Sequence, residues 1–228
     1  MKAGDTHILD SSGRDIKVYI SQTFNKPVIY LNTFEEGDEV YRALRESGCP
    51  DFTLAAVSGL SWNHDMSPWA ISMAAEKDTP FTGGADAYLQ ILTERIMPAV
   101  EDLVPGQVPW RGLAGYSLAG LFALYAAYQT EVFTRFASVS GSLWFPGCKE
   151  YVFTQEMKVA PEAFYFSLGD KECRTRNPYM KTVQTCTEEI AAFYREKGID
   201  TIYELNPGNH FQDSARRMAS GIAWILDR

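Results

Sequence analysis

The sequence lacks a long hydrophobic run and a cluster of basic residues. No window is apolar over the length of a membrane-spanning helix, and the N-terminal stretch MKAGDTHILDSS has no apolar core of the kind a signal peptide needs. The formal net charge is −8, so a polyanion would be repelled. We therefore expect a cytoplasmic protein with neither a nucleic-acid nor a membrane partner.

Cysteine is also sparse, and no repeat or low-complexity linker divides the chain. The four cysteines show no Cys-x-x-Cys spacing, so they predict free thiols rather than a zinc site or a redox pair. Apolar residues make up 46% of the chain and charged residues 22%, as in an ordinary globular protein. The length suits one domain over residues 1–228.

Short β-branched or apolar runs alternate with segments of helical spacing. This alternation predicts an α/β fold with a mostly parallel central sheet and helices on both faces. Strands are expected at 6–9, 16–21, 27–31, 52–57, 111–115, 136–139, 163–168 and 201–205, the first two antiparallel around a turn at Ser12-Gly13. Helices are expected at 38–47, 85–100, 118–129 and from about 211 to 226, with a long loop over 58–84.

The segment RGLAGYSLAG sets Ser117 between an apolar strand and an apolar helix. A sharp strand-to-helix turn of this kind, a nucleophile elbow, needs small neighbours and lifts the serine Oγ clear of the backbone. The Leu118 amide at the helix N-terminus would then donate to a developing oxyanion. The fifth position of the G-x-S-x-G motif is Ala119 instead of glycine. A serine N-cap in an ordinary turn is the alternative interpretation.

Histidine is scarce enough for elimination to identify a base. In a hydrolase with this elbow the chain order is Ser, then Asp or Glu, then His. His7 and His64 precede Ser117, which leaves His210, directly after the last expected strand. The acid should follow the preceding strand, where FYFSLGDKE offers both Asp170 and Glu172 to hold the imidazole tautomer.

These motifs resemble the putative-esterase family of α/β hydrolases, which includes trilactone siderophore esterases, feruloyl esterases and S-formylglutathione hydrolases. The likeness covers most of the chain and is carried by WNHDMSPW, TGGADAYLQILTERIMPAVE, AGYSLAGLFALYAA with SVSGSLWF, SLGDKE and GNHF. It implies the α/β-hydrolase fold without an obvious lid domain, a Ser-acid-His triad, no metal, no cofactor, and hydrolysis of carboxylic esters.

Carried over by position, the resemblance assigns the acid to Glu172, with Asp170 as the fallback. It also implies a second oxyanion donor in YLNTFEE, at the Phe34 amide, although relatives carry a small-residue loop there.

Aromatic residues near the expected site have two interpretations. Tyr116, Trp62, Trp69 and Trp144 form either an aromatic wall for the substrate or the packing of the long loop. Likewise, Arg174 and Arg176 either hold an anionic substrate group or are solvated.

The sequence therefore predicts a serine esterase that hydrolyses a small soluble ester through an acyl-enzyme on Ser117. The expected partner is a small-molecule ester, and no particular oligomeric state is predicted. Alternatives are an acyltransferase with the same triad, a thioester hydrolase, and a non-catalytic binding protein on a hydrolase scaffold.

Overall fold

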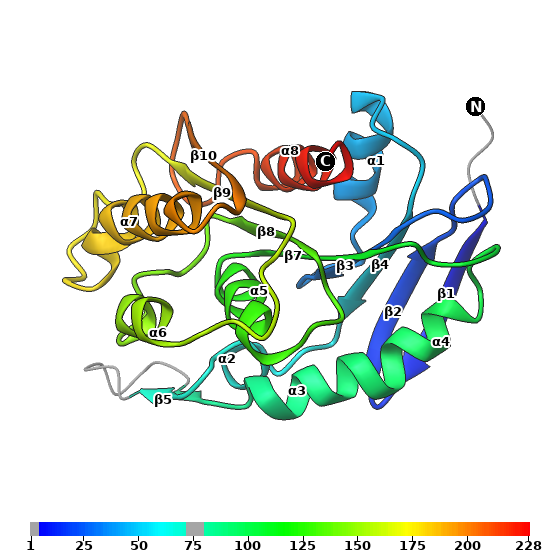
Figure 1. The fold of residues 1–228 in the computed structure, drawn as a ribbon, viewed down its shortest axis with the longest axis horizontal. Helices are drawn as coiled ribbons and strands as arrows, with labels where there is room; N and C mark the ends of the chain where they lie inside the picture. The colour runs from blue at the N-terminus through cyan, green and yellow to red at the C-terminus, as the bar shows by residue number, and fades with distance from the viewer. Residues whose placement is uncertain (1–4, 72–79) are drawn as a thin grey trace.

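A twisted sheet runs through the computed structural model, which describes residues 5–71 and 80–228 (Figure 1). Within these residues the sheet has eight strands, ordered β1-β2-β4-β3-β7-β8-β9-β10. Their bounds are β1 Thr6–Ser11, β2 Arg14–Tyr19, β3 Val28–Asn32, β4 Thr53–Ser58, β7 Arg111–Tyr116, β8 Arg135–Val139, β9 Ala163–Gly169 and β10 Asp200–Asn206. The β1-β2 and β2-β4 pairs are antiparallel, whereas β4 to β10 run parallel.

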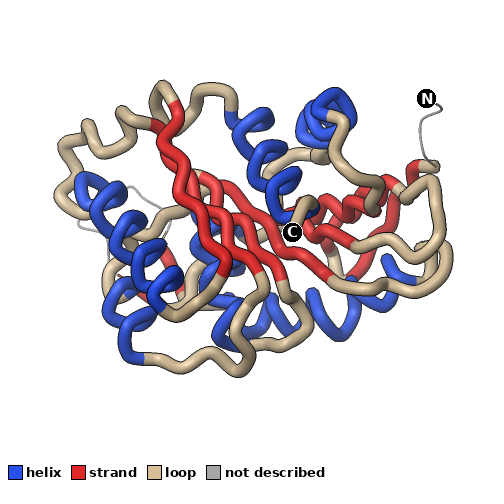
Figure 2. Tube along the Cα trace, turned by 45° about the horizontal axis from the view of Figure 1, so that its top comes forward, coloured by secondary structure: helices blue, strands red, loops and turns tan. Residues whose placement is uncertain are grey.

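Helices cover both faces of this sheet, as predicted (Figure 2). One face packs against α1 (Asp38–Ser47) and α8 (Ser214–Leu226), with Leu44 and Ile222 in its core. The other face packs against α3 (Ala85–Ile91), α4 (Met97–Glu101), α5 (Leu118–Gln129), α6 (Cys148–Thr154) and α7 (Val183–Glu196). Because both faces are covered, the inner strands β3, β4 and β9 are buried along their whole length.

The expected helix over 85–100 contains an irregular segment. Between α3 and α4 the chain forms a π-helical stretch, η1 (Leu92–Ile96), and Pro98 lies near the start of α4. Proline lacks an N–H and crowds the preceding turn of an α-helix, and a wider π turn relieves this conflict. The helix is therefore continuous in direction but not in hydrogen-bond pattern.

The long loop expected over 58–84 is more structured than the sequence indicated. It contains a short helix, α2 (Trp62–Asp65), and the antiparallel strands β5 (Ala70–Ile71) and β6 (Phe81–Thr82). Residues 72–79 of that loop lie outside the described residues. A further short element, the 3-10 helix η2 (Met180–Thr182), precedes α7.

The parallel register brings several chain segments to one edge of the sheet. Asn32 of β3 pairs with Gly115 of β7, and Gly115 pairs with Ser138 of β8. The connections after β3, β7, β8, β9 and β10 therefore emerge side by side at the carboxyl edge, where α/β sheets bind ligands. In the described part of the chain, no helix is long and apolar enough to cross a membrane.

Candidate active site

The turn between β7 and α5 holds Ser117 in an unusual backbone conformation. Its φ of 58° and ψ of −121° are rare for any residue other than glycine. Backbone hydrogen bonds on both sides hold it there. The Ser117 amide donates to the Val139 carbonyl at 3.1 Å, and the Ser117 carbonyl accepts from the Ser142 amide at 2.9 Å. The strain is thus maintained by the neighbouring loop after β8.

Close packing around this turn explains its small residues. A Cβ on Gly115 would lie 2.6 Å from the Ala119 Cβ and would overlap the Ala119 carbonyl. A Cβ on Gly120 would lie 2.9 Å from both the Gly141 Cα and the Ser138 Oγ. Ala119 itself is fully buried. The turn therefore needs glycine at 115 and 120 and has room for the methyl group at 119.

A continuous hydrogen-bonded chain links Ser117, His210 and Glu172. His210 lies on the loop between β10 and α8, and its Nε2 is 3.1 Å from the Ser117 Oγ. Its Nδ1 is 2.7 Å from the Glu172 Oε2. Because an ionised carboxylate only accepts hydrogen bonds, Nδ1 carries the hydrogen and a neutral imidazole presents Nε2 as the acceptor. This is the tautomer a general base for Ser117 requires.

Four donors hold the Glu172 carboxylate, whose side chain is 4% exposed. Besides His210, the Oε1 accepts from the Ser140 hydroxyl at 2.8 Å, the Gly169 amide at 2.6 Å and the Arg217 guanidinium at 2.7 Å. Burial opposes ionisation of this group, but the hydrogen bonds from His210, Arg217 and Gly169 outweigh it and lower its pKa to about 2.

Asp170, the fallback acid, contacts a different partner. Its Oδ1 accepts a hydrogen bond at 2.8 Å from the amide of Gly208, in the loop that carries His210. On the other side of that loop, the Tyr116 hydroxyl donates to the His210 carbonyl at 2.7 Å. The geometry therefore brings Glu172 to the imidazole and Asp170 to the backbone of the loop that carries it.

The two expected oxyanion donors come from different segments next to the serine. Leu118 is the first residue of α5, where backbone amides lack partners within the helix and the helix dipole is positive. Phe34 follows β3 and lines the same pocket as Ser117. Its side chain is 70% exposed and stacks on Trp62 at 3.7 Å between ring centroids.

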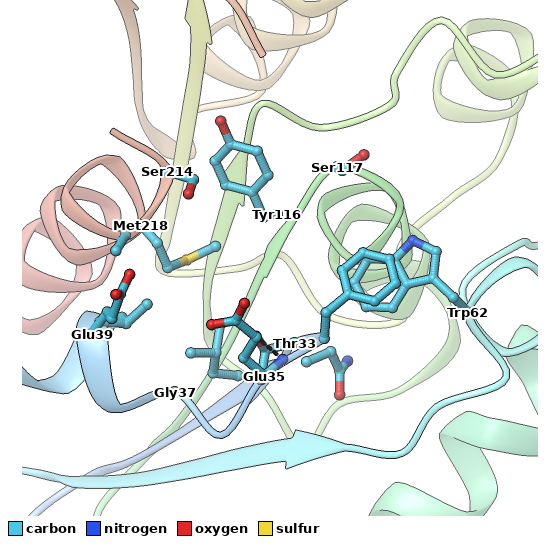
Figure 3. Close-up of a pocket in the computed structure, with 14 residues that line it drawn as sticks. Thr33, Glu35, Gly37, Glu39, Trp62, Tyr116, Ser117, Ser214 and Met218 are labelled. Carbon is cyan, nitrogen blue, oxygen red and sulfur yellow. Dashed lines mark hydrogen bonds between the residues drawn. The ribbon is translucent and has the colours of Figure 1, made fainter. Parts of the chain in front are cut away.

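Two pockets meet at Ser117. The first, here the Trp62 pocket, has a volume of about 230 Å³, and its lining includes Trp62, Tyr116, Phe34, Glu35 and Glu39 (Figure 3). The second, the Trp144 pocket, has a volume of about 450 Å³. Ser117 and His210 both line this pocket. Its lining also includes Trp144, Phe211, Lys171 and Arg174.

The fourth aromatic candidate, Trp69, is not among the residues that line either pocket. Its ring packs against Phe145 and Tyr151, and its Nε1–H donates to the Pro146 carbonyl at 2.9 Å. These contacts favour the interpretation of Trp69 as packing of the long loop. Arg176 is likewise absent from both linings, whereas Arg174 borders the Trp144 pocket.

Sequence reasoning did not find Arg217, Ser140 or Lys171. Arg217 lies on the buried face of α8, at helical spacing from Gly221 and Ile225. A charged residue on this otherwise apolar face could have indicated a buried partner. Ser140 follows β8 with a positive φ of 46°, which no motif predicts. Lys171 lies between the two candidate acids, where no motif marks it.

The match to a known family agrees with this architecture. Residues 17–177, more than half of the chain, match the family model described as "Putative esterase". The chain belongs to this esterase family.

Solved structures with the same fold include several hydrolases. An IroE-like serine hydrolase from Shewanella oneidensis superposes with a TM-score of 0.78 at 17% identity, covering 98% of this chain and 80% of that one. The siderophore hydrolase EstA from Aspergillus nidulans gives 0.76 at 18% identity, with 99% and 95% covered. Enterobactin hydrolase IroE, in a complex with DFP, gives 0.71 at 19% identity, with 98% and 93% covered. The fold is the α/β-hydrolase fold.

Proposed function

We propose that this chain is a serine esterase that hydrolyses small carboxylic esters through an acyl-enzyme on Ser117. The observation that carries the proposal is the hydrogen-bonded chain from Ser117 through His210 to Glu172, built on a strained strand-to-helix turn. An ordinary N-cap serine would need neither the strained backbone nor a buried carboxylate behind a histidine.

The proposed reaction assigns a group of this chain to each step. His210 accepts the Ser117 proton as Oγ attacks the ester carbonyl, and Glu172 stabilises the imidazolium that forms. The amides of Leu118 and Phe34 would stabilise the oxyanion. The imidazolium then returns its proton to the leaving alcohol, and water releases the acid from Ser117 by the same steps in reverse.

The pocket volumes of about 230 and 450 Å³ suit a substrate of small or moderate size. Some relatives of similar fold are described as siderophore hydrolases, so polyester siderophores belong in the first substrate panel.

The test is labelling of the purified protein with a fluorophosphonate probe, followed by intact mass measurement and an ester panel. We expect one adduct on the wild type and none on Ser117→Ala, with ester turnover reduced at least about 10⁴-fold. Ser142→Ala is the matched control, because its hydroxyl lies 3.5 Å from that of Ser117 in the same pocket. An adduct that survives in Ser117→Ala, or no adduct on folded wild type, would contradict the proposal.

A further inference from the structure

The loop after β9 makes one rim of the site basic in an otherwise acidic protein. Residues 170–181 contain two acids, Asp170 and Glu172, and four cations, Lys171, Arg174, Arg176 and Lys181. Both acids are engaged by hydrogen bonds from neighbouring groups, Asp170 with the Gly208 amide and Glu172 with His210 and Arg217. All four cations are exposed at the surface, although the net charge of the chain is −8.

Two of these cations border the Trp144 pocket beside the reacting groups. Lys171 and Arg174 line it together with Ser117 and His210, and neither forms a side-chain hydrogen bond or ion pair within the described residues. Glu172 also borders this pocket, but Arg217 offsets its charge in a pair whose side chains are each 4% exposed. The pocket is therefore positive at its rim, where two cations lack a side-chain partner among residues 5–71 and 80–228.

The charge changes sign on the other side of Ser117. The Trp62 pocket is lined by Glu35 and Glu39, which are both exposed, and no Lys or Arg is among the described residues that line it. An anionic group would be repelled from this pocket and attracted to the other. The two pockets thus orient a charged ester across Ser117.

The position of His210 decides which part of the ester enters each pocket. As the Ser117 Oγ bonds to the carbonyl carbon, the bond from that carbon to the alcohol oxygen breaks, and His210 passes the serine proton to this oxygen. The leaving alcohol must therefore lie on the side of His210, which lines the Trp144 pocket and not the Trp62 pocket.

Resting on the esterase function proposed above, we propose that the preferred substrate is an ester of an alcohol or phenol that carries an anionic group. Lys171 and Arg174 bind that anion at the rim of the Trp144 pocket, while Trp144 and Phe211 supply an apolar flank for the body of the alcohol.

The experiment compares 4-acetoxybenzoate with 4-acetoxybenzamide, which share shape and acyl group and differ in one negative charge. For the wild type we expect kcat/KM to favour the anion about fivefold, chiefly through KM, and the preference to shrink as salt screens exposed charges. Lys171→Gln with Arg174→Gln should abolish it. The matched control is Arg176→Gln with Lys181→Gln, which removes the same charge from the same loop outside the pocket lining and should keep the preference.

The outcomes separate this inference from the esterase function. Equal rates for the two esters, or a preference lost equally in both double variants, would overturn the anion site while leaving the esterase intact. Monophenyl succinate and phenyl succinamate carry the same difference on the acyl side, and a larger preference there would overturn the assignment to the alcohol.

If neither acetyl ester is turned over, protection of Ser117 from the fluorophosphonate probe still decides the question. 4-Hydroxybenzoate should slow labelling more than 4-hydroxybenzamide does, and equal protection would refute the anion site. Absence of labelling itself would instead refute the esterase function.

Discussion

Replacing Arg217 by methionine removes the positive charge behind the candidate acid while keeping much of the side-chain volume. The guanidinium donates to the Glu172 Oε1 at 2.7 Å, to the Ser140 hydroxyl, and to the Asn209 carbonyl at 3.2 Å. It also lies 5.7 Å from the centre of the Tyr116 ring. In the variant, Glu172 keeps its bonds from His210, Ser140 and Gly169 but loses its only ion pair with a permanent cation among the described residues.

The size of the effect follows from burial. Both side chains of the pair are 4% exposed, and removing one partner of a buried pair costs about 3–5 kcal/mol of unfolding free energy. We expect about 3 kcal/mol here, because the remaining donors still solvate the carboxylate. Looser orientation of Glu172 should lower kcat/KM by about 10- to 100-fold, since the carboxylate positions the imidazole without reacting itself.

The pH profile separates positioning from mere stability. Without Arg217 the charge of Glu172 is uncompensated and stabilises the imidazolium of His210 more strongly. The acid limb of kcat/KM should therefore move to higher pH. Other titratable groups near the guanidinium are Tyr116 and Tyr165, the latter bonded to Glu204, and all of them remain in the variant.

Arg217→Lys retains the charge and should keep the limb in place, and exposed Arg216→Met is the matched control for the loss of a surface charge. The measurements are steady-state pH profiles together with urea unfolding of each variant. Lost activity with an unmoved acid limb would mean that Arg217 only holds the fold together. Wild-type kcat/KM in Arg217→Met would refute the positioning role outright.

Three further outcomes follow from the same geometry. Glu172→Gln should lower kcat/KM by about 10³- to 10⁴-fold. Asp170→Asn only weakens the hydrogen bond from Gly208 and should lower kcat/KM less than about tenfold. Equal losses in steady-state assays would contradict the assignment of Glu172 as the acid. Gly115→Ala should cost several kcal/mol in urea unfolding or prevent folding, because its Cβ would overlap Ala119, and wild-type stability would refute the packing argument. The pKa of Glu172 falls from an ordinary 4.5 to about 2, so its stabilisation is present above pH 4.5 and is lost as the pH falls through 2. The free energy of unfolding should thus decline by about 3 kcal/mol between pH 4.5 and pH 2, and less steeply in Glu172→Gln. The same dependence of unfolding free energy on pH in both proteins would contradict this prediction.

The sequence predicted the strand and helix order well because each element has a local signal. The runs before and after Ser117 are apolar on all sides, and the parallel strands are short and bounded by turns. The turn at Ser12-Gly13 was visible for the same reason, and both residues have the positive φ that such turns need. Elements set by longer-range packing, such as α2 and the β5-β6 pair, gave no local pattern.

The choice between Asp170 and Glu172 shows where local reasoning ends. Both residues follow β9, and spacing alone does not decide which one faces the sheet edge. The chain turns tightly there, with the Glu172 amide donating to the Gly169 carbonyl at 3.1 Å. That turn points Glu172 at His210 and leaves Asp170 beside Gly208. The resemblance to the esterase family favours Glu172, whereas the local sequence is compatible with either acid.

The alanine at position 119 bears on the alternative of a non-catalytic scaffold. If Ala119 marked the loss of an active site, Ser117 should have an ordinary backbone conformation. A strained conformation persists only where surrounding contacts maintain it. Instead Ser117 keeps its φ of 58° and its 3.1 Å contact with His210, and the methyl group of Ala119 is fully buried beside Gly115. Position 115 requires glycine, because a side chain there would collide with the α5 backbone. Ala119 is therefore a packing variant of the elbow, and it gives no physical reason to expect an inactive protein.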